Sequence, residues 1–400
     1  MSFFAAVGMA PGDPILGLVE TFKADPRPDK INLGIGVYLD EQGRIPLLAT
    51  VREVEQALAL TSAPRGYLPI DGLAAYNQLA QQLLFGAEAE VLAAGRVATA
   101  QTIGGSAALR VGADVLKQLL GERAQVAISD PSWGNHQVVF RAAGFAISQY
   151  RYFNPANHGL DFSGMLEDLA RLEPDSVVLL HACCHNPTGV DLNAEQWQRA
   201  IALVHERKLL PFVDMAYQGF DQGLAQDALV LRLLAQSPVR AFVVANSYSK
   251  SFSLYGERVG ALSMVGTDRA EAARLLSNMK QTIRTIYSSP ATHGAALVAG
   301  VLGSSELRTR WESELGSMRS RIHAMRAGFV ERLTAHGAAQ FGFINQQAGM
   351  FSYSGLTRAQ VHRLRDEFAI YALDSGRICV AALSHDKLDV VAAAVAAVTR

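Results

Sequence analysis

At 400 residues the chain is too long for one small module, and its 50% hydrophobic and 18% charged residues exclude a disordered protein. Its 36 Lys+Arg residues nearly balance 37 Asp+Glu residues, so the sequence predicts no basic face for nucleic acid or an anionic membrane. The three cysteines include the adjacent pair Cys183 and Cys184, a poor layout for a disulfide framework. With no basic leader and no long uncharged apolar run, we expect a soluble, cytoplasmic protein that acts on small molecules.

Short runs rich in Val, Ile and Ala alternate with amphipathic stretches from Arg96 onward. The runs predicted to be buried strands are 97–102, 126–130, 177–181, 211–214, 241–247 and 260–265. The stretches predicted to be helices are 107–120, 136–143, 194–206 and 270–283. Strands that alternate with helices predict an α/β domain with a mostly parallel sheet covered on both faces.

The pattern changes after Gly303, where apolar residues recur every three or four positions from Trp311 to Leu333. This spacing predicts one long helix that ends near Gly337 and connects to a second domain. The remaining segment, with strand candidates at 349–354 and 377–383, is too short to fold alone. We therefore expect it to pack with residues that precede Gln42.

Two motifs suggest chemistry that the neighbouring residues do not support. Gly34-Ile35-Gly36 could open a dinucleotide-binding loop, but Leu39 stands at the third glycine position and no amphipathic helix follows. The segment from His181 to His185 contains two histidines and two cysteines, yet adjacent residues on an extended chain point to opposite faces. No second Cys/His cluster completes a zinc site, so no metal is predicted.

Polar residues follow four of the predicted strands, and the carboxyl ends of parallel strands are where open α/β sheets bind ligands. They lie in the segments 130–133, 185–189, 214–217 and 247–250. The chain has only seven lysines against 29 arginines, and one of these lysines, Lys250, comes shortly after the apolar run 241–245. Partial desolvation lowers the pKa of a lysine and makes its amine a nucleophile that forms a Schiff base with a carbonyl.

A phosphate site is predicted beside this lysine. Gly104-Gly105-Ser106 joins a strand to the helix at 107–120, and free N–H groups at a helix amino terminus accept a phosphate. Ser247 and Arg258 could complete the site. A phosphate ester that carries an aldehyde would satisfy both the lysine and the phosphate site.

These and other motifs resemble the aspartate/aromatic branch of the class I aminotransferases, which use pyridoxal 5′-phosphate. In chain order they are Asn-Leu-Gly-Ile-Gly-Val-Tyr (32–38), Ser-Asp-Pro-Ser-Trp (129–133), Cys-Cys-His-Asn-Pro-Thr-Gly (183–189), Asp-Met-Ala-Tyr-Gln-Gly-Phe (214–220), Ser-Tyr-Ser-Lys (247–250), Gly-Glu-Arg-Val-Gly (256–260) and Ser-Gly-Arg (375–377). The resemblance implies a fold-type I, seven-stranded, mostly parallel sheet between helices, with a smaller α+β domain built from both chain ends. It implies an amino-terminal arm and part of the small domain in 1–41, a large cofactor-binding domain in 42–303, and the connecting helix with the rest of the small domain in 304–400.

The resemblance also implies roles for residues around the cofactor ring. Lys250 matches the Schiff-base lysine that moves the proton between substrate Cα and cofactor C4′. Asp214 matches the carboxylate that pairs with the pyridinium nitrogen, which keeps the ring an electron sink. Tyr217 and Asn186 match the hydrogen-bond partners of the ring's phenolic oxygen, and Trp133 matches the aromatic side chain stacked on the ring.

Further matches concern the phosphate, the substrate and the surrounding shell. The phosphate ligands expected from the same subunit are Gly105, Ser106, Ser247 and Arg258, whereas Tyr67 and Arg284 match residues contributed across a homodimer interface. Arg377 matches the arginine that grips the substrate α-carboxylate with a planar fork. The substrate-binding residues expected are Gly36, Trp133, Asn186, Arg284 and Arg377. His136 and His181 match supporting positions, with His136 bonded to Asp214, and the bonds before Pro131 and Pro187 match cis peptides.

The implied reaction is reversible transfer of an amino group from an L-amino acid to 2-oxoglutarate in two half-reactions. Ile45, Ser106 and Ser289 resemble the choices in members that accept aromatic substrates, so we favour an aromatic-amino-acid aminotransferase that retains activity with aspartate. An aspartate-restricted aminotransferase is the alternative. A ligand-sensing domain of a transcription regulator is disfavoured, because the motifs begin at residue 32 and leave no room for a DNA-binding domain. Another pyridoxal enzyme, such as a β-lyase or a decarboxylase, could use the same scaffold.

Overall fold

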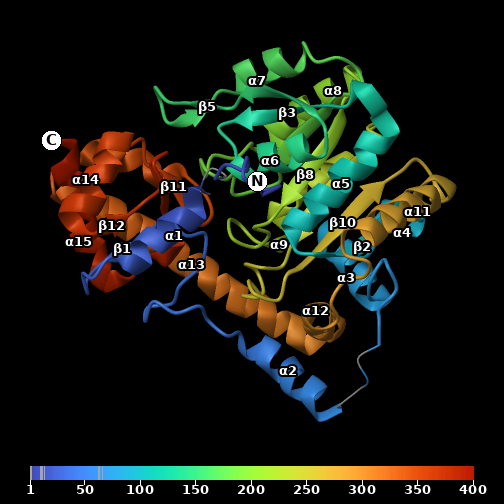
Figure 1. The fold of residues 1–400 in the computed structure, drawn as a ribbon, viewed down its shortest axis with the longest axis horizontal. Coiled ribbons are helices and arrows are strands. Elements are labelled where there is room, and N and C mark those ends of the chain that lie inside the picture. The colour runs from blue at the N-terminus through green and yellow to red at the C-terminus, as the bar shows by residue number, and fades with distance from the viewer. Residues whose placement is uncertain (1, 10–11, 13, 62–63, 65) are drawn as a thin grey trace.

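The computed structural model describes residues 2–9, 12, 14–61, 64 and 66–400. A seven-stranded sheet forms the centre of the larger part of the molecule (Figure 1). Its strands, in spatial order, are β2 (Val97–Ile103), β10 (Val259–Val265), β9 (Phe242–Ser247), β8 (Leu210–Met215), β7 (Val177–His181), β3 (Gln125–Asp130) and β4 (Ala146–Arg151). Only β10 runs antiparallel to both of its neighbours, so the predicted mostly parallel sheet is confirmed.

Helices cover both faces of this sheet, and each face has its own apolar core. One core joins Phe212 and Leu262 of the sheet to side chains of α5 (Gly105–Leu120), α6 (Gly134–Ala142) and α11 (Arg269–Ile286). The other core lies against Val213 and Val244 and includes side chains of α3 (Ala74–Phe85), α8 (Ala194–Glu206), α10 (Leu229–Gln236) and α12 (His293–Gly303). The remaining elements of this part are α2 (Ala49–Thr61), α4 (Glu90–Ala93), η1 (Gly121–Arg123), β5 (Phe153–Asn154), β6 (Gly159–Leu160), α7 (Phe162–Leu169) and α9 (Leu224–Asp227). The rigid two-sided packing fixes the loops at the strand ends.

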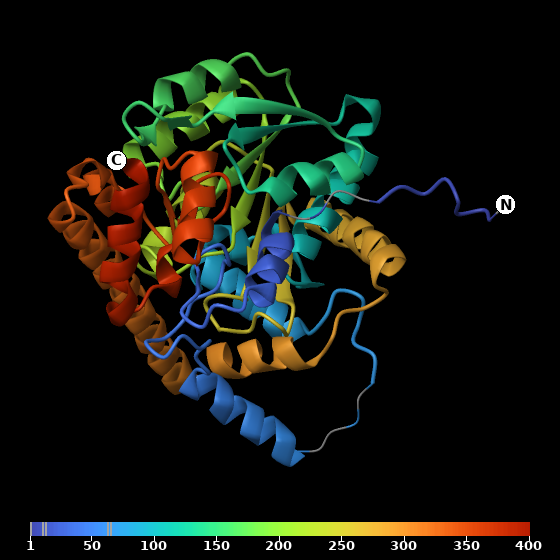
Figure 2. The ribbon, with the colours of Figure 1, turned by 60° about the vertical axis from the view of Figure 1, so that its left-hand side comes forward.

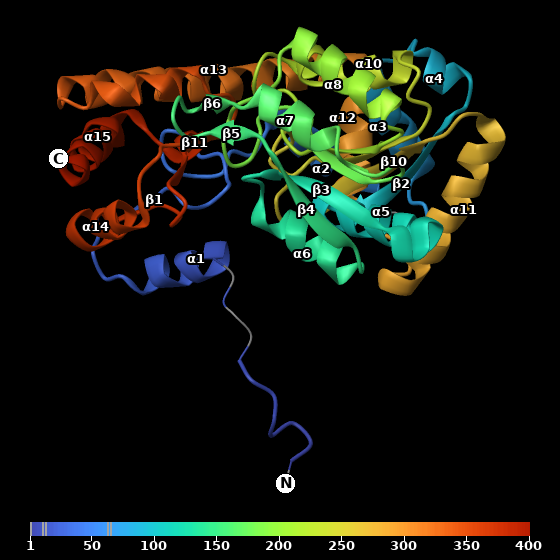
Figure 3. The ribbon, with the colours of Figure 1, turned by 90° about the horizontal axis from the view of Figure 1, so that it is seen from above.

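The smaller part combines the two ends of the chain, as expected. The long helix α13 (Ser305–Ala335) runs from the larger part into it (Figure 3), and the predicted connecting helix is therefore confirmed. The amino-terminal strand β1 (Ile31–Asn32) pairs in parallel with β12 (Ile370–Tyr371). The other elements are α1 (Pro14–Ala24), η2 (Ala339–Gln346), β11 (Phe351–Tyr353), α14 (Arg358–Phe368), β13 (Arg377–Cys379), η3 (Val380–Ala382) and α15 (His385–Thr399). The division at residues 41 and 303 stays a prediction.

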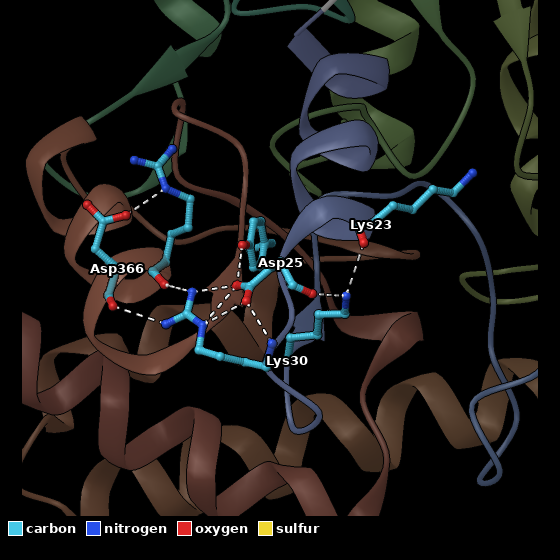
Figure 4. Close-up of polar contacts among 7 residues, drawn as sticks. Lys23, Asp25, Lys30 and Asp366 are labelled. Atoms are coloured by element: carbon cyan, nitrogen blue, oxygen red, sulfur yellow. Dashed lines mark hydrogen bonds and ion pairs between the residues drawn. The ribbon is translucent and has the colours of Figure 1, made fainter.

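A polar cluster ties the segment after α1 to this smaller part (Figure 4). The Arg27 guanidinium pairs with Asp25 and donates to the carbonyl oxygens of Arg365 and Asp366 at 2.9 and 3.1 Å. These carbonyls belong to the last turn of α14, where a cation is favourable. The hydroxyl of Tyr371 donates to Asp25 Oδ2 at 2.6 Å. The segment that leads to β1 is thus held by residues from the opposite end of the sequence.

Two expectations about strands need correction. The strand expected at 377–383 ends at Cys379 and continues as the short 3₁₀ helix η3, because only 377–379 find a partner in β11. The strand expected at 349–354 shrinks to 351–353 for the same reason. The edge strand β4 was not predicted, since most of its side chains are at least partly exposed and its sequence lacks an apolar run. No helix in the described ranges is long and apolar enough to cross a membrane.

Candidate active site

The loops at the carboxyl ends of β3, β7, β8 and β9 converge on one cavity of about 400 Å³. Segments from the smaller part close its other side. The cavity is lined by Ile35, Gly36, Val37, Gly105, Ser106, Leu109, Trp133, Asn186, Asp214, Ala216, Tyr217, Ser247, Ser249, Lys250, Tyr255, Arg258, Phe351 and Arg377. Residues from across the sequence therefore meet where the sheet topology predicts a ligand.

Asp214, at the end of β8, anchors a chain of hydrogen bonds that runs beneath the cavity. Its Oδ2 lies 2.9 Å from Nε2 of His136, which is fully buried. Although burial alone would raise the pKa of Asp214, the hydrogen bond from His136 brings that pKa below its ordinary value. Asp214 is therefore a buried carboxylate that faces the cavity.

The direction of every bond in this chain follows from its two ends. The backbone N–H of Asn186 donates to Nδ1 of His181 at 3.4 Å, and burial lowers the pKa of His181 to about 3, so this ring is neutral and protonated on Nε2. His181 Nε2 then donates to the Ser132 hydroxyl at 3.3 Å, and that hydroxyl donates to Nδ1 of His136 at 3.0 Å. His136 Nε2 is left to donate to Asp214. This chain of hydrogen bonds fixes the tautomer of His181 and directs the negative charge of Asp214 into the cavity.

Lys250 lies on the loop after β9, with its Nζ 4.9 Å from the ring centroid of Tyr217. Burial lowers the pKa of Lys250 to about 8, and the charge of Asp214 opposes this shift. At neutral pH a much larger fraction of this amine is uncharged than in an exposed lysine. The site thus contains an amine suited to attack a carbonyl carbon.

Arg377 enters the same cavity from β13 and is only 3% exposed. Its Nη1 donates to Oδ1 of Asn186 at 3.2 Å, and its Nη2 donates to the carbonyl of Gly34 at 2.7 Å. The guanidinium lies 4.1 Å above the ring centroid of Phe351. Nε has no partner, and no carboxylate within the described ranges pairs with this cation. A buried, unpaired arginine that faces a cavity is suited to bind an anion from outside.

A second anion position lies at the amino terminus of α5. Gly104, the residue before the helix, has φ +87°, and a Cβ there would collide with the guanidinium of Arg258. No side chain caps this helix, so its first N–H groups remain available, and Ser106, Ser247 and Ser249 line the same cavity. Arg258 forms no ion pair in the part of the chain that the structure describes. This donor set suits a phosphate group.

The sequence matches the family Aminotransferase class I and II over residues 28–395. This chain belongs to that family. It is 58% identical to an aspartate aminotransferase of Pseudomonas aeruginosa over 99% of both chains, and 48% identical to an aromatic-amino-acid aminotransferase of Escherichia coli over 99% of this chain and 100% of the relative. A solved aromatic-amino-acid aminotransferase of Burkholderia pseudomallei, covalently bound to pyridoxal phosphate, superposes with a TM-score of 0.97 at 57% identity, over 100% of both chains.

The expected enzyme class and cofactor are confirmed by this membership: the chain is an aminotransferase that depends on pyridoxal 5′-phosphate. The cavity fits this group, since it offers a buried carboxylate, an amine with a lowered pKa and an anion site on one wall. Both Asp130-Pro131 and Asn186-Pro187 are cis, as the resemblance implied. In the described ranges, no group of three or more His, Cys, Asp or Glu side chains is placed to hold a metal ion.

Two of the residues expected in the site of this aminotransferase lie outside the cavity of a single chain. The Tyr67 side chain is 99% exposed, and Arg284, near the end of α11, is exposed and donates to the hydroxyl of Ser288. Sequence reasoning also missed several lining residues. Five of them lie within or beside quoted motifs and could have been found, namely Ile35, Val37, Ala216, Ser249 and Tyr255. Nothing in the sequence marked the other two, Leu109 and Phe351.

Proposed function

We propose that this chain transfers amino groups from aromatic L-amino acids, and from aspartate, to 2-oxoglutarate. The observation that carries the proposal is the single cavity in which an amine, a carboxylate and an unpaired arginine meet beside an apolar wall. Lys250 and Asp214 serve the cofactor, and Arg377 serves a carboxylate that every amino acid carries. The apolar wall supports an aromatic side chain in the remaining space.

The bound cofactor supplies an aldehyde that captures amines and a ring that accepts the electron pair released at the substrate Cα. Asp214 holds the proton on the ring nitrogen, and His136 keeps this carboxylate ionised. With its lowered pKa, Nζ of Lys250 would serve as the base that moves the proton at the substrate Cα. Trp133, which lines the cavity, would hold one face of the ring when the cofactor is bound.

Tyr217 and Asn186 position the ring's phenolic oxygen in this scheme. The amide Nδ2 of Asn186 donates to the Tyr217 hydroxyl at 3.3 Å, which leaves the hydroxyl proton of Tyr217 free for an acceptor in the cavity. Burial raises the pKa of Tyr217, so this hydroxyl keeps its proton. The phosphate is held by the amino terminus of α5 with Ser106, Ser247 and Arg258.

We also propose that the enzyme is a homodimer with shared active sites. The amino-terminal arm extends away from the rest of the chain (Figures 2 and 3), and its apolar side chains Phe3 and Met9 are 93% and 100% exposed. Exposed apolar side chains of this kind suit burial against a second copy. Arg284 and Tyr67 would then reach the cavity of the neighbouring subunit, where Arg284 binds the distal carboxylate of a dicarboxylic substrate.

The predicted domain boundaries and the predicted cytoplasmic location of the protein belong to the same proposal. Residues 42–303 bind the cofactor, whereas 1–41 and 304–400 form the part that carries Arg377 over the substrate. The three cysteines are buried free thiols, which suits the reducing cytoplasm.

An aspartate-restricted enzyme is the alternative, favoured by the 58% identity to an aspartate aminotransferase. The two functions differ in one measurement, the ratio of kcat/KM for phenylalanine to that for aspartate with 2-oxoglutarate as common acceptor. We expect both donors to turn over with kcat/KM values within about a hundredfold of each other. If phenylalanine is slower by a factor of 10⁴ or more, the aspartate-restricted function replaces ours.

A further inference from the structure

The segment Leu33–Leu39 covers one side of the active-site cavity without regular secondary structure after Asn32. Its residues Ile35, Gly36 and Val37 line the cavity directly. The buried side chains of Leu33 and Tyr38 anchor the segment in the core, and without a strand ladder its backbone is placed by a few particular hydrogen bonds. The partners of this segment therefore decide how closely it approaches a substrate.

Most of these partners belong to the smaller part of the molecule. Leu33 N–H donates to the Tyr371 carbonyl at 2.7 Å, and Leu33 accepts from Cys379 N–H at 2.8 Å. Leu39 N–H donates to the carbonyl of Ala381 at 3.0 Å. With the bond from Arg377 to Gly34, these contacts join the segment to β12, β13 and η3. The segment is thus attached mainly to the smaller part.

Within the described residues, a single hydrogen bond joins the segment to the part of the chain between 42 and 303. The backbone N–H of Tyr38 donates to the phenol oxygen of Tyr255 at 2.9 Å. Tyr255 follows Lys250 on the same loop and lines the cavity, and its carbonyl accepts from Nη1 of Arg258 at 3.2 Å. Tyr255 therefore contacts both the loop that carries the lysine and the segment that covers the substrate.

We propose that Tyr255 is a positioning residue that fastens the Leu33–Leu39 segment over bound substrate by accepting the Tyr38 amide. The phenol sets the distance of Ile35 and Val37 from the cavity floor, whereas Lys250 and Asp214 keep their places without it. Loss of the phenol oxygen should make the Leu33–Leu39 segment more mobile and weaken substrate binding. The rate of the chemical step in the bound complex should change little. The inference extends the proposed function by naming what holds the substrate-facing wall in place.

Tyr255→Phe tests this in the cofactor-loaded enzyme, because it removes the oxygen and keeps the ring. Without substrate, we expect amide hydrogen exchange of a peptide spanning 33–39 to accelerate on the order of tenfold, with no change in β9. With phenylalanine or aspartate, KM should rise roughly tenfold and kcat should stay within about twofold. Tyr353→Phe is the matched control, since the Tyr353 hydroxyl makes no hydrogen bond among the described residues, and it should change none of these quantities.

Two outcomes would overturn the inference. Unchanged exchange at 33–39 in Tyr255→Phe would mean that the bond does not fasten the segment. Faster exchange accompanied by a fall in kcat alone would place Tyr255 in the chemical step. Because the exchange measurement needs no substrate, it remains decisive even if the proposed donors prove wrong, and the two failures can be told apart.

Discussion

Removal of the Arg377 guanidinium should lower kcat/KM for every amino-acid substrate by the same factor. In Arg377→Leu the substrate α-carboxylate loses two charge-assisted hydrogen bonds, each worth about 1.5–3 kcal/mol, or about 3–6 kcal/mol together. This corresponds to a loss of roughly 10²–10⁴ in kcat/KM. The buried Asn186 Oδ1 and Gly34 carbonyl also lose their donor, so the measured loss should fall toward the upper end.

Steady-state kinetics with aspartate and phenylalanine, at a fixed 2-oxoglutarate concentration, measure this effect. Arg377→Lys keeps the charge but not the fork, so its loss should be intermediate, roughly 10- to 100-fold. Arg363→Leu is the matched control, because Arg363 is a half-exposed arginine of the same part that pairs with Glu367 on its own helix. A loss that differs more than tenfold between the two donors, or wild-type activity in Arg377→Lys, would refute the assignment of Arg377 to the shared α-carboxylate.

Three further predictions concern other residues of the site. Asp214→Ala should lower kcat on the order of 10³-fold, because the cofactor ring nitrogen then faces no anion; near-normal kcat would remove Asp214 from the mechanism. Arg284→Leu should lower kcat/KM for aspartate by roughly 10²- to 10⁴-fold and leave phenylalanine nearly unchanged, and equal losses would contradict the dual-substrate proposal. The pKa of His181 falls from 6.5 to about 3 on folding, so the unfolded chain binds the proton first, and this residue should lower stability by up to ~1.4 kcal/mol per pH unit as the pH falls from 6.5 toward 3. Urea unfolding of the holoenzyme at several pH values should show a shallower slope in His181→Gln, and an unchanged slope would mean that His181 does not titrate in this range.

Much of the large sheet could be predicted because its strands are buried on both faces. A strand such as Val177–His181 then reads as an unbroken apolar run, and the polar residue that follows it must lie at the ligand-binding edge. The strand β4 broke this rule, because it exposes much of Ala146–Arg151 and carries polar residues, whereas β2 at the opposite edge of the sheet is buried.

The contacts that complete the site could not be predicted from local pattern. The bond from Arg377 to Gly34 joins residues 343 positions apart, and the bond from Tyr38 to Tyr255 joins residues 217 apart. Nothing in the sequence near Tyr255 distinguishes a phenol that accepts a backbone amide from one that faces solvent. Family resemblance supplied residue roles, but only the folded chain supplies the hydrogen bonds of Tyr255.

The pairing of β1 with β12 has a consequence for how the protein is made. During synthesis Ile31 leaves the ribosome long before Ile370, its partner, is added to the chain. The nearby contact between Arg27 and Asp366 spans 339 residues. The central sheet can assemble during synthesis, whereas the first segment must wait for nearly the entire chain. A nascent or truncated polypeptide therefore contains Lys250 and the phosphate site while it still lacks Arg377. The substrate carboxylate site is the last part of the active site to form.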